Sequence, residues 1–260
     1  MHARTAGSGI LDEVLSLLLG AACAGCDAPG ELLCGGCRLS LTAAPVRRLL
    51  ADGMPVVAAL RFEGVAARCI RAMKEEGATL LARPLSEALR TVLPTDAGVR
   101  LVPVPTSRAA FRRRGYRVPE LLIRATGRRA ERLLVPGSVV SDQRGLGRSE
   151  RARNVTGSMR AQRRGSGEEV VVLDDVITTG ATLSEASRVL GAAGFRVLGT
   201  VALAATPHHD EHIGDTSEMG GDIRWNADYG RGSQGDHGPP LAGRTGTRRH
   251  EWKRASSGSE

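Results

Sequence analysis

Hydrophobic positions fall into alternating helical and strand-like patterns between residues 55 and 206. Within residues 62–77, for example, Val65, Cys69 and Met73 recur at the spacing of one helix face. The periodicity predicts helices over residues 62–77, 117–130, 147–161 and 181–192. Short aliphatic runs predict strands at residues 100–105, 139–141, 170–175 and 195–205. Strands that alternate with helices indicate an α/β fold whose parallel sheet is covered by helices on both faces.

The same pattern divides the chain into three parts. Residues 1–50 contain an expected N-terminal helix and a cysteine cluster, residues 51–206 form the α/β domain, and residues 207–260 form a tail. The tail is rich in Gly, Asp, Ser and Arg and poor in aliphatic residues, so we expect it to be disordered. The alternative for the tail is a metal site formed by His208, His209 and His212.

The N-terminal segment ILDEVLSLLLGAAC, residues 10–23, has the look of a secretory signal that ends in a lipidated cysteine. However, Asp12 and Glu13 interrupt the apolar run, and Gly20 stands where that signal has leucine. A short amphipathic helix is therefore the expectation. No uncharged stretch approaches the roughly 18 residues that a membrane span requires. We expect a soluble, cytoplasmic protein without membrane insertion.

Positive charge is concentrated in the first four fifths of the chain. The formal net charge is +8, and residues 1–207 carry 29 basic against 19 acidic residues, whereas residues 208–260 carry 7 against 9. Residues 100–164 alone contain 17 arginines and only 4 acids. Such a field favours phosphorylated small molecules or nucleic acid as ligands. Because genomic base composition also produces arginine-rich chains, charge by itself does not choose between them.

The segment VVVLDDVITTGAT, residues 170–182, combines an aliphatic run, two acids and a loop of small residues. The run is typical of a strand buried on both faces, and open α/β sheets bind ligands at the carboxyl ends of such strands. In residues 178–182, backbone N–H groups, threonine hydroxyls and a helix start can surround an anion. Gly180 allows the backbone to approach closely, and Thr182 with Glu185 fits a capping box.

The two acids, Asp174 and Asp175, would repel a phosphate but can accept hydrogen bonds from vicinal hydroxyls. Together with the neighbouring anion loop they predict recognition of a ribose 5-phosphate. The alternative is a solvated strand end followed by an N-terminal helix cap. A nucleotide P-loop is excluded because the loop lacks a Gly-Lys-Ser/Thr ending, and the chain has no dinucleotide fingerprint.

The cysteines form two CxxC pairs, Cys23 with Cys26 and Cys34 with Cys37. Two such pairs can place four thiolates around one tetrahedral Zn²⁺, which would be structural because protein ligands fill its coordination sphere. The alternatives are disulfides, which are uncommon in cytosolic proteins, and thiols without metal. The fifth cysteine, Cys69, lies on a predicted helix face and is expected to be a small buried hydrophobe.

Three motifs together resemble a known family. VVVLDDVITTGAT resembles the phosphoribosyl-pyrophosphate (PRPP) signature of type I phosphoribosyltransferases. LVPVPTSRAAFRRRGY, residues 101–116, and GLGRSERARNVTGSM, residues 145–159, narrow the resemblance to the ComF family. Members of that family join a cysteine cluster to a phosphoribosyltransferase domain and are associated with DNA uptake during competence. The resemblance covers roughly residues 20–206 and implies a parallel sheet flanked by helices with a small N-terminal zinc-binding element.

The resemblance also implies a site. The 5-phosphate of PRPP would lie on residues 178–182, the ribose hydroxyls would meet the two acids, and the pyrophosphate would lie near residues 104–107. Mg²⁺ would bridge phosphate and ribose oxygens with few protein ligands. The implied PRPP contacts are Asp174, Asp175, Val176, Thr178, Thr179, Gly180, Ala181, Thr182, Pro105, Thr106 and Ser107. The implied catalytic residues are Asp174, Asp175, Lys74 and Arg112.

Further cations surround this implied site. Lys74, the only lysine before residue 253, matches a lysine common in the family, although a surface lysine at a helix end is the alternative. The other cations expected near the pyrophosphate are Arg108, Arg113 and Arg114. A mobile loop that closes over the site is expected to contain Arg148, Arg151, Arg153 and Asn154. The chain departs from the family after Tyr116, where Arg117 and Val118 replace an Asn-Gln pair whose amides could hydrogen-bond a second substrate.

Two functions are compatible with these observations. The first is an enzyme that transfers the 5-phosphoribosyl group of PRPP to an amine or base and releases pyrophosphate. The second is a non-catalytic ComF-type module that binds single-stranded DNA or a competence helicase. With only 3 Phe, 2 Tyr and 2 Trp, the chain offers few platforms for base stacking, so DNA binding would be mainly electrostatic and salt-dependent.

Overall fold

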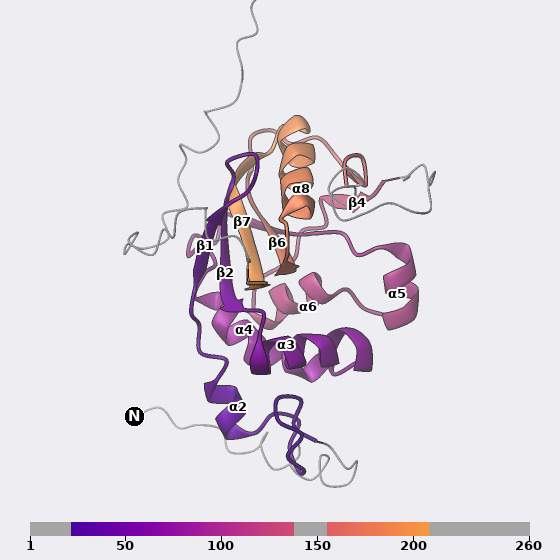
Figure 1. Cartoon of the computed structure of the whole chain (residues 1–260). Coiled ribbons are helices and arrows are strands. Elements are labelled where there is room, and N and C mark those ends of the chain that lie inside the picture. The colour runs from indigo at the N-terminus through magenta and orange to yellow at the C-terminus, as the bar shows by residue number, and fades with distance from the viewer. Residues whose placement is uncertain (1–21, 138–154, 208–260) are drawn as a thin grey trace, which may run out of the picture.

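The protein is built around a five-stranded sheet in the order β1-β2-β7-β6-β3, seen in a computed structural model that describes residues 22–137 and 155–207 (Figure 1). All neighbouring strands are parallel except β1, which pairs antiparallel with β2. The strands of this sheet are β1 (Val46–Leu49), β2 (Pro55–Arg61), β3 (Arg100–Pro103), β6 (Glu169–Ile177) and β7 (Arg196–Ala205). A separate antiparallel pair consists of β4 (Leu134–Pro136) and β5 (Met159–Ala161).

The central strands are apolar because both of their faces are covered. Residues 170–173 of β6 are fully buried, and nearly all of β7 is buried as well. Alternate residues of β6 belong to different cores, with Val171 and Leu173 in one and Val170 and Val172 in the other. This alternation is the geometry of a strand that lies between two layers of helices, so the predicted fold class is confirmed.

Helices cover the two faces unequally. The first face packs against several elements and the second against one long helix (Figure 1). The elements on the first face are α3 (Gly64–Arg71), the π-helical turn η1 (Ala72–Glu76), the 3₁₀ turn η2 (Thr79–Leu81), α4 (Ala82–Arg90) and α6 (Val118–Ala125). The second face is covered by α8 (Ala181–Ala192), which contributes Leu183, Ala186 and Leu190. A short helix, α5 (Arg108–Arg114), follows β3 and buries none of its residues.

The cysteine-containing segment joins the first core directly. It includes α2 (Gly35–Leu39) and lies below α3 and α4 in Figure 1. Four of its residues, Cys23, Leu33, Cys37 and Leu41, are buried in the same apolar cluster as Met73. The N-terminal segment is therefore part of the wall of the main core.

Most predicted elements are confirmed, with two corrections. The helix expected over residues 147–161 is wrong in its described part, because residues 159–161 form β5 and pair with β4. A three-residue strand is fixed by its partner, and its own sequence carries no period. The capping box of Thr182 and Glu185 is also wrong: the N-cap of α8 is Gly180, which has no side chain, and Glu185 is engaged elsewhere.

Several predictions concern residues outside those that the structure describes. These are the helix before Cys23, the strand at residues 139–141, the arginine and asparagine loop at residues 148–154, and the histidine-containing tail after residue 207. Among the described residues, no helix has the length and apolar character needed to cross a membrane.

Candidate functional site

The site lies where two neighbouring parallel strands send their following helices to opposite faces of the sheet. β3 and β6 pair from Arg100 beside Val170 to Pro103 beside Leu173. After β3 the chain leads to α6 on the first face, and after β6 it leads to α8 on the second face. Such a switch point leaves a crevice at the carboxyl ends of the two strands, which is the usual ligand position in open α/β sheets.

The two acids predicted from the sequence lie near the carboxyl end of β6. Asp175 is buried, and its Oδ1 lies 2.7 Å from Nζ of Lys74. Asp174 is partly buried and accepts a hydrogen bond of 2.8 Å from the backbone N–H of Asp175. Lys74 therefore forms an ion pair with one of the two predicted acids.

The environment of Asp174 disfavours its charge. Burial, together with the nearby charge of Asp175, raises the pKa of the Asp174 carboxyl from 3.8 to about 7, although the Asp175 N–H and the Lys74 ammonium oppose the rise. Near neutral pH this carboxyl is thus poised between its two protonation states. Groups tuned in this way, with a charge partner and a crevice, are typical of functional sites.

A tyrosine fixes the turn that carries the lysine. The hydroxyl of Tyr116, in the connection between α5 and α6, donates a hydrogen bond to the carbonyl of Met73. Gly77 ends the turn with a positive φ of 77°, a conformation that favours glycine. The connection after α5 therefore positions the backbone next to Lys74, a role for Tyr116 that sequence analysis missed because the two residues are far apart in the chain.

The loop after β6 leads directly into the first turn of α8. Thr178 and Thr179 are exposed, and Gly180 has φ of 78° and forms the N-cap of α8. The Thr179 hydroxyl lies 3.4 Å from the backbone N of Ala181. The first N–H groups of a helix have no intrahelical acceptor and carry partial positive charge, so this end of α8 attracts an anion.

Glu185 serves a neighbouring segment instead of capping α8. Its carboxylate is buried, accepts the backbone N–H of Gly157 at 2.7 Å and pairs with the Arg188 guanidinium at 2.7 and 2.8 Å. These contacts lower the pKa of Glu185, first through Arg188. The hydrogen bond to Gly157 therefore holds the segment just before β5 against α8.

The turn after β3 meets the start of α8 in one cavity. The Val104 N–H donates to the Leu173 carbonyl at 2.9 Å, which joins the turn to β6, and Ser107 caps α5 by accepting the Ala110 N–H at 3.2 Å. A cavity of about 720 Å³ opens between the turn and the helix. Its lining residues are Pro105, Ser107, Arg108, Pro136, Gly137, Val155, Ser158, Met159, Arg160 and Thr182. Of the predicted PRPP contacts, Pro105, Ser107 and Thr182 line this cavity. Residues 178–181 of the loop, and the group of Asp174, Asp175 and Lys74, do not line it.

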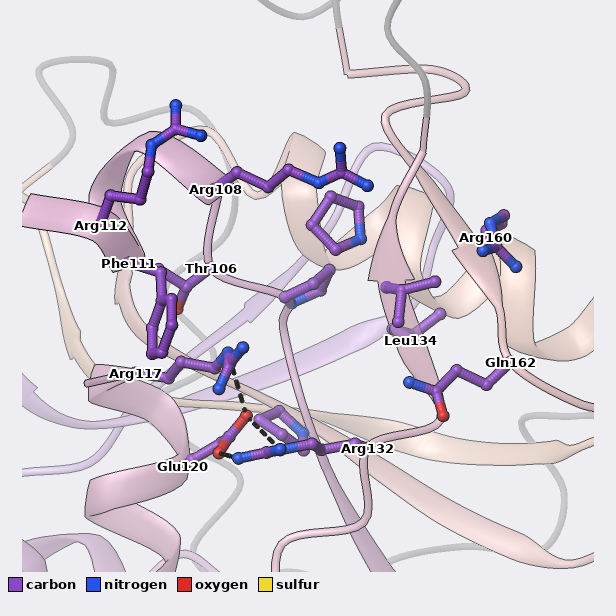
Figure 2. A pocket seen from close by; sticks show the side chains of 14 residues that line it. Thr106, Arg108, Phe111, Arg112, Arg117, Glu120, Arg132, Leu134, Arg160 and Gln162 are labelled. Carbon is purple, nitrogen blue, oxygen red and sulfur yellow. Dashed lines mark hydrogen bonds and ion pairs between the residues drawn. The ribbon is translucent and has the colours of Figure 1, made fainter. Parts of the chain in front are cut away.

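The arginines of α5 differ in their surroundings: two line cavities, one is exposed, and one has a buried Nε. Arg108 lines the cavity just described and also a second one, of about 430 Å³, that Arg112 lines as well (Figure 2). Arg113 is exposed. The Nε of Arg114 is buried and has no hydrogen-bond partner among the described residues. Of the predicted cations, Arg108 is the one that the structure brings to the cavity at the switch point.

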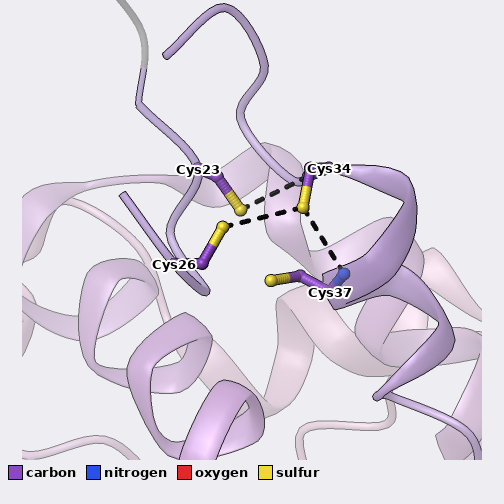
Figure 3. A group of neighbouring side chains, drawn as sticks. All are labelled: Cys23, Cys26, Cys34 and Cys37. Carbon is purple, nitrogen blue, oxygen red and sulfur yellow. Dashed lines mark hydrogen bonds between the residues drawn. The ribbon is translucent and has the colours of Figure 1, made fainter. Parts of the chain in front are cut away.

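The four predicted cysteine ligands converge on one point (Figure 3). Their sulfur atoms all lie within 4.8 Å of one another, and Sγ of Cys26 and Sγ of Cys34 are 3.7 Å apart. In a tetrahedron with Zn–S bonds of about 2.3 Å, sulfur atoms are roughly 3.8 Å apart. Cys23, Cys26, Cys34 and Cys37 thus form a group that can hold a metal ion such as zinc, and none of them forms a disulfide.

Backbone N–H groups already favour a thiolate in this cluster. Burial raises the pKa of Cys23, but hydrogen bonds from backbone N–H groups, that of Cys34 foremost, outweigh it and lower the pKa to about 6. Burial and the neighbouring thiols raise the pKa of Cys37. Cys69 is fully buried outside the cluster, and burial raises its pKa to about 11, as suits a small apolar side chain.

The cluster docks on α3 through close contacts that sequence analysis did not anticipate. Arg68 pairs with Asp27 and also lies 3.4 Å from the carbonyl of Ala24. A Cβ on Gly25 would lie 2.5 Å from the Cys37 sulfur, so only glycine fits there. The cysteine cluster therefore packs against α3, which continues directly into the η1 turn that contains Lys74.

Comparison with known proteins gives a partial match. Residues 122–233 match the model of the phosphoribosyl transferase domain, a stretch that begins in α6 and contains β6, its loop and α8. The chain therefore carries a region similar to that domain. The search of curated proteins found no match.

Solved structures show distant similarity. An adenine phosphoribosyltransferase from Rhodothermus marinus is 17% identical, covers 65% of this chain and 86% of its own, and has a TM-score of 0.31. The orotate phosphoribosyltransferase from Aeropyrum pernix is 17% identical over 63% and 76%, with a TM-score of 0.31. An allosteric regulatory enzyme of purine biosynthesis is 20% identical over 48% of this chain, which spans 26% of that enzyme, with a TM-score of 0.31. Nothing about the chemistry of this chain follows from similarity of that size.

Proposed function

We propose that this protein binds PRPP with Mg²⁺ and transfers its 5-phosphoribosyl group to an amine or base, with release of pyrophosphate. The observation that carries the proposal is the switch point itself, where two acids and a threonine-glycine loop stand beside the turn after β3. A hydroxyl clamp next to an anion cradle fits a phosphorylated ribose, and the match to the phosphoribosyl transferase domain supports it.

Each part of the site has a distinct task in this proposal. The N–H groups and hydroxyls of residues 178–182 bind the 5-phosphate, and the turn at residues 104–107 with Arg108 holds the pyrophosphate end. As the acceptor nitrogen bonds to C1 of the ribose, the bond from C1 to the pyrophosphate oxygen breaks and the acceptor's proton passes to water. The negative charge that develops on the leaving group is stabilised by fixed cations.

Asp174 and Asp175 orient the ribose by accepting hydrogen bonds from its hydroxyls. Asp175 already holds Lys74 at 2.7 Å, so the ammonium is positioned before any ligand arrives. When the ribose hydroxyls take over hydrogen bonds to Asp175, Lys74 becomes available to an incoming phosphate oxygen.

Two metal ions belong to the proposal. The donor set at the switch point fits Mg²⁺, which keeps several waters, uses few carboxylates and neutralises phosphate charge when bound. The four converging sulfurs fit Zn²⁺, which would be structural because the thiolates close its coordination sphere.

The test is a calorimetric titration of PRPP with Mg²⁺ into the zinc-loaded protein and into an Asp174→Ala, Asp175→Ala double variant. Losing a carboxylate that accepts a ligand hydrogen bond costs about 1.5 to 3 kcal/mol, which is roughly a ten- to hundredfold loss of affinity. Glu169→Ala is the matched control, because Glu169 begins the same strand and pairs with Arg196 at 2.7 Å away from the loop. Absence of binding to the intact protein, or equal binding to the double variant, would reject the site.

The alternative function is a non-catalytic ComF-type module in the cytoplasm that binds single-stranded DNA or a helicase-like partner in transformation. It is favoured by the arginines of α5, of which Arg108 and Arg112 are exposed and have no acidic partner among the described residues. A DNA titration at several salt concentrations tests it, since binding through phosphates weakens steeply with salt. Binding that is insensitive to salt would rule out this electrostatic mode.

A further inference from the structure

A second cavity, whose lining includes five arginines, adjoins the proposed PRPP site (Figure 2). Its volume is about 430 Å³, within the range of roughly 300 to 1,000 Å³ that is usual for small-molecule sites. It lies between α5, the start of α6 and the β4–β5 pair, and it shares Pro105, Arg108, Pro136 and Arg160 with the larger cavity. The two hollows are thus neighbours with a common rim.

The charge of this arginine pocket is strongly positive. Five arginines line it, namely Arg108, Arg112, Arg117, Arg132 and Arg160, against one acid, Glu120. In the part of the chain that the structure describes, Arg108, Arg112 and Arg160 have neither an ion pair nor a hydrogen bond with a carboxylate. Guanidinium groups that line a hollow and are not neutralised by a carboxylate favour an anionic ligand, which they can bind through two parallel N–H groups.

Glu120 organises the deeper part of the pocket. Glu120 is only 6% exposed, and its carboxylate accepts hydrogen bonds from both Nε and Nη2 of Arg132, at 2.8 and 2.6 Å. Nε of Arg117 lies 3.6 Å from the same carboxylate. In Figure 2, Glu120 lies between these two guanidinium groups. One buried acid therefore holds two cations in place without cancelling the charge of the pocket.

A flat apolar wall completes the pocket. The guanidinium of Arg117 stacks over the ring of Phe111 at 4.1 Å, and prolines and Leu134 line the sides. A stacked arginine and an aromatic ring accept a planar heterocycle well. Arg117 is also the residue that stands where the ComF pattern has asparagine, so this chemistry belongs to the present chain.

We propose that the arginine pocket binds a small phosphate monoester that carries a planar ring, which is the chemistry of a mononucleotide. A phosphate monoester carries nearly two negative charges at neutral pH, which suits a pocket with four positive charges in excess. The pocket shares Pro105, Thr106 and Arg108 with the turn proposed to hold the pyrophosphate, whereas Arg117, Glu120 and Arg132 belong to the pocket alone. The inference goes beyond the proposed function, because it does not depend on PRPP binding or turnover.

The experiment titrates AMP into the zinc-loaded full-length protein and into the Asp174→Ala, Asp175→Ala double variant. AMP at the arginine pocket binds both proteins alike, because the two acids do not line that pocket, whereas AMP that occupies only the proposed PRPP site is lost with them. Adenosine lacks the phosphate and inorganic phosphate lacks the planar ring, so each should bind at least tenfold more weakly than AMP. If the protein does not bind PRPP, the AMP titration still measures the pocket, so the two proposals fail separately.

Substitutions inside and outside the arginine pocket test whether AMP binds there. Arg117→Gln should weaken AMP roughly ten- to hundredfold, as expected when a charged hydrogen-bond donor is lost. Arg163→Gln is the matched control, because Arg163 also stacks on an aromatic ring, Phe195 at 4.9 Å, and pairs with Glu168 outside the pocket. A Glu120→Gln, Arg132→Gln double variant removes both charges of the buried pair together, so it gives a second reading if Arg117→Gln folds poorly.

The outcomes are distinct. Binding that persists in the Asp174→Ala, Asp175→Ala variant, weakens in Arg117→Gln and is unchanged in Arg163→Gln supports the proposal. Displacement of AMP by a short 5′-phosphorylated single strand, but not by the same strand without the phosphate, would assign the monoester to a nucleic acid end. Absence of AMP binding, its loss in the Asp174→Ala, Asp175→Ala variant, or equal loss in Arg117→Gln and Arg163→Gln overturns the proposal.

Discussion

Replacement of Asp174 by Asn should stabilise the protein at alkaline pH. The pKa of Asp174 is raised from 3.8 to about 7, so between these values the folded protein binds a proton that the unfolded chain has lost. Stability therefore falls as the pH rises from about 4 to 7, and above pH 7 the ionised carboxylate imposes its full penalty. Asn keeps the Oδ1 that accepts the Asp175 N–H at 2.8 Å but carries no charge at any of these pH values.

The size of the effect follows from the rise in pKa. At about 1.4 kcal/mol per pKa unit, the ionised form costs roughly 4 kcal/mol, and partial exposure of Asp174 reduces this to about 2 to 4 kcal/mol. For a domain of this size, each kcal/mol changes the melting temperature by roughly 2 to 4 °C. Asp174→Asn should thus melt at least about 4 °C above the unmodified protein at pH 8.

Thermal unfolding followed by circular dichroism at pH 5, 6, 7 and 8 measures this difference. The gap should shrink steadily toward pH 5. Glu168→Gln is the control of opposite sign, because the Ser166 N–H and Arg163 lower the pKa of Glu168 to about 2. The Glu168→Gln variant should melt below the unmodified protein by the same number of degrees at every pH from 5 to 8. A gap for Asp174→Asn that does not change with pH, or a less stable variant at pH 8, would refute the reasoning.

Three further changes test other parts of the molecule. Tyr116→Phe removes the donor that holds the η1 turn, and should lower stability by about 1 kcal/mol and weaken PRPP binding in calorimetry. Cys34→Ser should lower the zinc content, measured by metal release to a chromogenic chelator, and lower the melting temperature with it. Gly180→Ala should cost more than Gly127→Ala in chemical denaturation: both have φ near 80°, but only at Gly180 would the Cβ lie 2.4 Å from Leu50.

The layered fold was predictable because its strongest signals are local. The aliphatic run before Asp174 and the helical spacing after Gly180 each depend on neighbouring residues, and both appear in the structure as β6 and α8. The four converging cysteines were predictable for the same reason, since two short spacings fix each pair. Where an element depends on a distant partner, as β5 does on β4, the sequence pointed to a helix instead.

Contacts between distant residues account for what sequence analysis missed in the site. Lys74 and Asp175 are separated by 101 positions, so their ion pair depends on how α3 and η1 pack beside β6. Glu185 has the spacing of a capping residue, yet its carboxylate reaches Gly157, 28 positions away. Charge counting found the arginine-rich stretch, but only packing shows which arginines Glu120 holds and which remain without a partner.

The shared core of the cysteine segment and the sheet has a consequence for shortened forms of this chain. Cys23, Leu33, Cys37 and Leu41 cover the same apolar cluster to which Met73 belongs. A chain that begins at residue 45 would keep β1 but expose that surface to water, which favours self-association. Such a form should aggregate or melt early even when the loop at residues 178–182 is intact. The cysteine segment therefore acts as a solubility element for the whole α/β domain, in addition to any metal it holds.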